Sequence, residues 1–137
     1  MPATININLE TECPVVFDMK KFIKKILTLL KIKTGDFSFT FVQNAQIVQI
    51  NQQFLKRDYA TDIISFNLGT VEDIEGDVYI SVEQAAINAT GLGHGLDLEI
   101  KTLLVHGILH LLDYQDYTEE ERSAMFAEQD RLLALAQ

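Results

Sequence analysis

Residues 37–42 read Phe-Ser-Phe-Thr-Phe-Val and alternate apolar and polar side chains, which is the pattern of a strand with one buried face. We expect Phe37, Phe39 and Phe41 to lie in the core rather than to form a base-stacking platform, because alternate residues share one face of a strand. Residues 4–9, 62–68 and 77–82 predict three further strands. The sequence therefore predicts four short strands.

Segments predicted to be helical lie between these strands and after them. They cover residues 19–31, a stretch that begins at Asn44 and ends near Leu55, residues 82–89, residues 97–112 and residues 118–136. Asp18 and Asn44 are expected to be N-caps, Gly35 is expected to close the first helix, and Thr118-Glu119-Glu120-Glu121 is a capping box. The predicted fold is α/β (α+β), with a mixed four-stranded sheet surrounded by about five helices.

Length and composition set limits on the organisation of the chain. It has 137 residues and is 47% hydrophobic, which suits a single domain over residues 1–137 with one core. The net charge of −9 argues against binding nucleic acid by bulk attraction. Lys20, Lys21, Lys24 and Lys25 nevertheless cluster, and we expect a solvated helix face there, with an RNA backbone track as the alternative.

Cysteine usage and hydropathy predict a cytoplasmic location. Cys13 is the only cysteine, so no internal disulfide can form, and it has no basic neighbour that would make it a reactive thiolate. The first residues lack the layout of a secretory signal. No apolar run reaches the roughly 18 to 20 residues of a membrane span, so we expect no membrane association.

Two histidines on a predicted helix are the strongest chemical signal. His106 and His110 are four residues apart, a spacing that makes side chains neighbours on a helix, so that one metal ion can reach both rings. The alternative is a pair of hydrogen-bonded core histidines. Gly107 between them costs about 1 kcal/mol of helix stability relative to alanine. It also stands where a thermolysin-type metalloprotease has its glutamate base, which disfavours that mechanism.

A catalytic zinc site needs a third protein ligand, and two aspartates follow the histidines. A continuing helix would place Asp113 about 10 Å along the axis from His106, which is too far. Asp116 comes within reach if the helix ends and the chain folds back, and Asp113 belongs to the residues that tolerate a left-handed helix terminus. We therefore predict His106, His110 and Asp116 as the metal ligands.

The segment that contains these residues resembles the signature of a known family. Residues 106–116, His-Gly-Ile-Leu-His-Leu-Leu-Asp-Tyr-Gln-Asp, are similar to H-G-x-L-H-L-x-G-Y-D-H of the YbeY family. Residues 58–66 resemble the family's D-x-P-T-D-V-L-S-F, and residues 76–81 resemble its G-D-I-x-I-S. The resemblance runs in order from about Ile50 to the end of the chain.

Several positions depart from the family pattern. Asp116 stands for the third metal-binding histidine, Asp113 for the helix-ending glycine and Gln115 for an aspartate. The position of an arginine implicated in catalysis in the family aligns with Leu55, and the neighbouring Arg57 is a candidate catalytic phosphate contact beside Lys56. His94 aligns near a polar family position, but we expect an exposed loop residue there.

The resemblance implies a metal-dependent, single-strand-directed endoribonuclease that acts in ribosomal RNA maturation and ribosome quality control. It also implies one divalent ion, with Zn²⁺ as the first choice, and single-stranded rRNA and the small ribosomal subunit as partners. Such an ion would lower the pKa of its water and act as a Lewis acid on the phosphodiester. Two alternatives remain open: a noncatalytic ribosome-assembly factor with a structural metal, and a metallohydrolase of small esters or amides.

Overall fold

The computed structural model describes residues 2–55 and 61–136, and its strands form one sheet. In spatial order the strands are β1 (Thr4–Leu9), β2 (Asp36–Val42), β4 (Glu75–Ser81) and β3 (Ile63–Asn67). β1 pairs with β2 and β2 with β4 in parallel, whereas β3 pairs with β4 antiparallel. The predicted mixed four-stranded sheet is confirmed.

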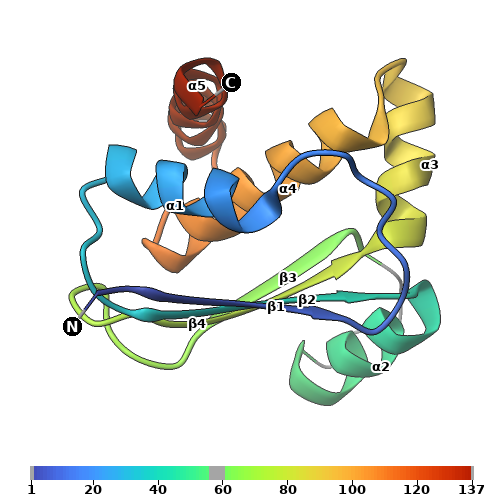
Figure 1. The fold of residues 1–137 in the computed structure, drawn as a ribbon, viewed down its shortest axis with the longest axis horizontal. Helices are drawn as coiled ribbons and strands as arrows, with labels where there is room; N and C mark the ends of the chain where they lie inside the picture. Colours follow the sequence, from blue (N-terminus) through green and yellow to red (C-terminus); the bar gives the residue numbers. More distant parts are fainter. Residues whose placement is uncertain (1, 56–60, 137) are drawn as a thin grey trace.

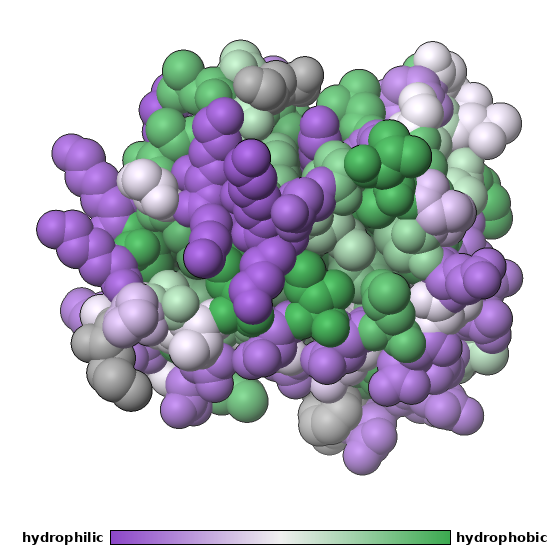
Figure 2. Space-filling model, in the orientation of Figure 1, coloured by the Kyte–Doolittle hydropathy of each residue, from purple (hydrophilic) through white to green (hydrophobic). Residues whose placement is uncertain are grey.

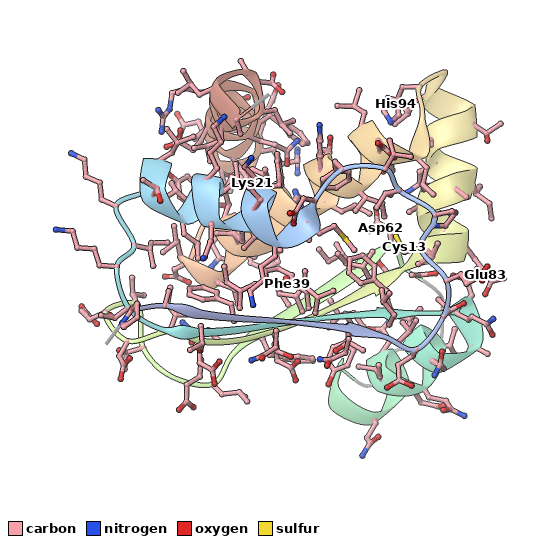
Figure 3. All side chains as sticks on the ribbon, viewed as in Figure 1. Cys13, Lys21, Phe39, Asp62, Glu83 and His94 are labelled. Carbon is pink, nitrogen blue, oxygen red and sulfur yellow. The ribbon has the colours of Figure 1, made fainter. Side chains whose placement is uncertain are left out.

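Helices cover both faces of this sheet. They are α1 (Met19–Leu29), α2 (Asn44–Leu55), α3 (Val82–Leu92), α4 (Leu96–Leu111) and α5 (Glu119–Ala136). Figure 1 shows α1, α4 and α5 on one face and α2 on the other. Phe37, Phe39 and Phe41 are fully buried, and Figure 3 shows Phe39 between the sheet and the helices, so the prediction that they belong to the core is confirmed.

Two of the expected helix caps are confirmed. The side chain of Asp18 accepts a hydrogen bond from the Lys21 N–H at the start of α1. Thr118 and Glu121 bond to each other's backbone N–H groups at the start of α5, as a capping box requires.

The other two expectations are wrong. Asn44 lies inside α2, because the carbonyl of Gln43 accepts the first helical hydrogen bonds and the Gln46 side chain bonds back to the Gln43 N–H. α1 ends at Leu29, well before Gly35, and Lys31 takes the left-handed conformation with φ of 60°. The backbone bonds from Lys31 and from Ile32 to the last turn stabilise that early end.

α4 packs closely on the sheet at Gly107. A Cβ atom at this position would lie 3.0 Å from Ile63 Cδ1 on β3 and 3.2 Å from Val78 Cγ1 on β4. Glycine thus lets the backbone of α4 approach the sheet. This close contact fixes the distance between β3 and the part of α4 that carries His106 and His110.

The lysine cluster lies on the outer face of α1. Lys20, Lys21, Lys24 and Lys25 are exposed, and Figure 2 shows hydrophilic side chains gathered over this helix. Within residues 2–55 and 61–136, no helix has both the length and the apolar character that a membrane span needs.

Candidate metal centre

The two imidazole rings of α4 face each other. His106 Nε2 and His110 Nε2 are 3.1 Å apart, and the ring planes cross at 77° with their centroids 4.6 Å apart. Both rings are half-buried. The spacing of one helical turn therefore brings two nitrogen atoms to one point, as the sequence predicts.

The Nδ1 atom of each ring is hydrogen-bonded to a carbonyl oxygen, from a side chain for His106 and from the backbone for His110. His106 Nδ1–H donates to Oε1 of Gln129 on α5 at 3.2 Å, and His110 Nδ1–H donates to the Tyr114 carbonyl at 3.0 Å. Because a carbonyl oxygen only accepts, each Nδ1 carries the proton and each Nε2 presents a lone pair. Two lone pairs that face each other need a shared proton or a cation between them.

The end of α4 brings an aspartate to these rings. Asp113 has a left-handed backbone with φ of 72°, and the N–H groups of Asp113 and Tyr114 bond to the carbonyls of His110 and Leu109. This is a Schellman motif, the chain reversal that the sequence predicts at Asp113. After the reversal, Asp116 Oδ2 lies 3.8 Å from His110 Nε2.

The three side chains form one compact donor group. One potential ligand atom from each of His106, His110 and Asp116 lies within 4.8 Å of the other two. Two ligands of a tetrahedral zinc ion, each bonded at about 2.0–2.1 Å, are separated by about 3.3 Å, close to the separation of the two Nε2 atoms. Imidazole nitrogen with carboxylate oxygen is a donor set that zinc accepts. The residues therefore fit a divalent ion.

The group opens into a polar pocket of about 430 Å³. Other parts of the chain supply most of its lining: Asn51 of α2, Thr61, Asp62, Ile63, Ile64 and Ser65 in and before β3, and Gln115 and Tyr117 after α4. Ser65 Oγ is buried there and has no hydrogen-bond partner among the described residues. Asp62 lines the same pocket as Asp116, so the pocket contains a second carboxylate. The Asn88 Nδ2–H group donates a hydrogen bond to Asp62 at 3.1 Å.

The electrostatics of the pocket favour the neutral form of the His106 ring. Burial, followed by the proximity of His110, lowers the pKa of His106 below its ordinary value, while the Gln129 hydrogen bond and the carboxylates of Asp62 and Asp116 oppose this shift. A neutral imidazole is the form that binds metal.

Sequence reasoning missed the residues that support this group. Gln129 is buried on α5 between Met125 and Leu132, at positions where helical spacing predicts an apolar side chain. A polar residue in that stripe is the signal that would have found it. Asn51 and Ser65 carry no comparable signal, because residues of α2 and β3 come to line the pocket of the histidines only in the folded chain.

The remaining predicted residues lie elsewhere. Arg57 and Lys56 fall outside the described residues, and Leu55 ends α2. His94 is half-buried rather than fully exposed, because it bonds to the buried Glu99 at 2.7 Å, and Figure 3 shows it where α3 meets α4.

Neither Cys13 nor the larger pocket of the protein offers comparable chemistry. Burial, together with Asp97, raises the pKa of Cys13 to about 11, which keeps the thiol protonated. A pocket of about 690 Å³ beside α1 is lined by Lys24, Lys31, Lys33 and mainly apolar residues, with no histidine, cysteine or carboxylate among its described lining residues.

The family of the chain follows from comparison with known proteins. The family model described as "Endoribonuclease YbeY" matches residues 6–137. The chain belongs to the YbeY family. Relatives named "Endoribonuclease YbeY" include one from Acholeplasma laidlawii, 47% identical over 68% of this chain and 69% of its own. Another, from Bacillus licheniformis, is 40% identical over 81% of each chain.

A solved structure has a similar fold. The solution structure of TM1509 from Thermotoga maritima matches with a TM-score of 0.71 at 24% sequence identity, over 97% of this chain and 89% of the other. At 24% identity this similarity is evidence for the fold alone.

Proposed function

We propose that this YbeY family member is a metal-dependent endoribonuclease whose metal ligands are His106, His110 and Asp116. The observation that carries the proposal is the pair of Nε2 lone pairs 3.1 Å apart, beside a carboxylate, in a polar pocket. Its family relatives are named endoribonucleases, which makes RNA the substrate class. A hydrolase of phosphodiester bonds is the enzyme class that this name describes.

The side chains divide the work between holding the ion and shaping the pocket. His106 and His110 would bind through Nε2, with Gln129 and the Tyr114 carbonyl fixing both tautomers, and Asp116 would be the third ligand. When bound, a Zn²⁺-type ion lowers the pKa of a water molecule and polarises a phosphoryl oxygen. Residue 107, between the two histidines, is a glycine that packs against the sheet, so α4 supplies no glutamate base there.

Finer parts of the proposal come from the family resemblance. We propose Zn²⁺ as the ion, Arg57 as a catalytic contact to the phosphate, and single-stranded ribosomal RNA of the small subunit as substrate. A cytoplasmic location and a single metallohydrolase domain over residues 1–137 complete the proposal. The lone cysteine and the composition of the chain support these last two points.

The test is cleavage of a labelled single-stranded RNA by the zinc-loaded protein. We expect cleavage that a chelator abolishes and added Zn²⁺ restores, and we expect His110→Ala to lose activity by at least about 100-fold while circular dichroism stays that of the parent. Lys25→Ala, on the exposed face of α1, is the matched control for a surface change.

Two outcomes would contradict the proposal. If the parent does not cleave RNA and His110→Ala unfolds, the ion is structural and the chain acts as an assembly factor. If the parent hydrolyses small esters and ignores RNA, the chain is a different metallohydrolase.

A further inference from the structure

We propose that Tyr117 is a stacking platform for one unpaired nucleobase at the mouth of the metal pocket, an inference that rests on the proposed endoribonuclease function. Tyr117 follows Asp116 in the chain and lines the same pocket as His106 and His110. Its side chain is 80% exposed. An aromatic ring at this place can cover a base whose backbone lies over the pocket.

The backbone on both sides of Tyr117 is fixed by hydrogen bonds. The Schellman motif at Asp113 sets the path before it, and the capping box of Thr118 and Glu121 sets the path after it. Arg122 Nη1–H also donates to the Asp116 carbonyl at 3.2 Å. The ring is thus presented from a defined position at low cost in backbone entropy.

No packing role accounts for this ring. Tyr117 precedes the N-cap of α5, where an apolar side chain often packs on the fourth residue of the helix. That residue is Arg122, which is itself exposed, so no such apolar contact forms and the ring stays in solvent. Among the described residues that line the pocket, Tyr117 is the only phenylalanine, tyrosine or tryptophan.

The charge around the pocket favours recognition by stacking. Glu119 and Glu120 are exposed just beyond Tyr117, and the whole chain has a net charge of −9. Attraction of phosphates by bulk charge is weak under these conditions. Base–aromatic stacking needs no net charge and accepts every base, but it requires a base that is free of its duplex neighbours. Tyr117 would therefore give the pocket a preference for single strands.

The absence of tryptophan from the sequence allows a direct test. Tyr117→Trp is then a single-tryptophan protein, and we expect quenching of its fluorescence by a 2′-O-methyl hexaadenylate but not by an abasic strand of equal length. Phe126→Trp is the matched control, because Phe126 is an exposed aromatic residue of α5 that does not line the pocket. Equal signals from both variants, or no quenching of Tyr117→Trp, would overturn the proposal.

Kinetics separate the stacking platform from the proposed function. We expect Tyr117→Ala to raise KM for single-stranded RNA about 5- to 150-fold, the range that loss of one stacked base implies, with kcat within about twofold, and Tyr117→Phe to keep the parent KM. An unchanged KM in Tyr117→Ala rejects the platform and leaves the nuclease intact. If no protein cleaves RNA, the nuclease fails and the quenching experiment still decides whether Tyr117 binds a base.

Discussion

Single hydrogen bonds decide which nitrogen atoms of the centre are free to bind a cation. Gln129 Oε1 and the Tyr114 carbonyl each accept a hydrogen bond from an Nδ1–H group, and this leaves both Nε2 atoms as acceptors. Gln129 is buried on α5, and its hydrogen bond to His106 sets the tautomer of that ring from another helix.

Replacement of Gln129 tests this role. We expect Gln129→Leu to weaken Zn²⁺ binding about 10- to 100-fold, because the Nδ1–H of His106 loses its acceptor and the ring can take the other tautomer. Gln129→Glu keeps an acceptor at the same place and should bind Zn²⁺ at least as tightly as the parent. Competition with a chromogenic chelator measures both, and parent affinity in Gln129→Leu would show that the hydrogen bond is dispensable.

The lowered pKa of His106 predicts how the metal-free protein responds to acid. Burial and the neighbouring His110 disfavour the proton in the folded state, so between the lowered pKa and about 6.5 the unfolded chain binds more protons than the folded one. The contribution of His106 to stability is therefore complete above about pH 6.5 and decreases as the pH falls through this window.

Urea unfolding in the presence of a chelator measures this contribution. We compare the parent with His106→Gln at about pH 5 and about pH 7.5, so that other titrating groups cancel. The parent should lose more of its free energy of unfolding toward pH 5 than the variant. Equal losses would mean that His106 titrates alike in both states.

The contact between Gly107 and the sheet sets the position of α4. A Cβ atom at Gly107 would lie 3.0 Å from Ile63 Cδ1 and 3.2 Å from Val78 Cγ1, so a side chain there would push these neighbours aside by a few tenths of an ångström. The spacing of His106 and His110 could be read from the sequence, because helix geometry is local. The reason for Gly107 could not, since β3 and β4 approach α4 only through tertiary packing.

Gly107→Ala should destabilise the protein although alanine favours helices. Overpacking against Ile63 and Val78 lowers the free energy of unfolding by about 1–3 kcal/mol, whereas the higher helix propensity of alanine raises it by about 1 kcal/mol. Gly91→Ala in α3 is the control, because a Cβ atom there meets nothing within 4 Å, and we expect it to stabilise by about 0.5–1 kcal/mol. Thermal unfolding compares the two, and a Gly107→Ala protein as stable as Gly91→Ala would contradict the packing argument.

The whole molecule shows which features a sequence can predict. Alternation, helical spacing and capping signals predicted the four strands and the five helices, because these patterns lie within short segments of sequence. The strand order β1-β2-β4-β3 and the assembly of the pocket from α2, β3 and α4 depend on contacts between distant segments. Asp116 was an exception, since one left-handed residue at Asp113 was enough to predict its return toward the histidines.

Zinc K-edge X-ray absorption of the zinc-loaded protein tests the metal centre most directly. We predict scattering from two imidazole nitrogens at about 2.0–2.1 Å and from oxygen at about 2.0–2.2 Å. Asp116→Ala should change the oxygen contribution and leave both imidazoles in place. A spectrum without imidazole scattering, or with sulfur at about 2.3 Å from Cys13, would contradict the assignment of His106, His110 and Asp116 as ligands.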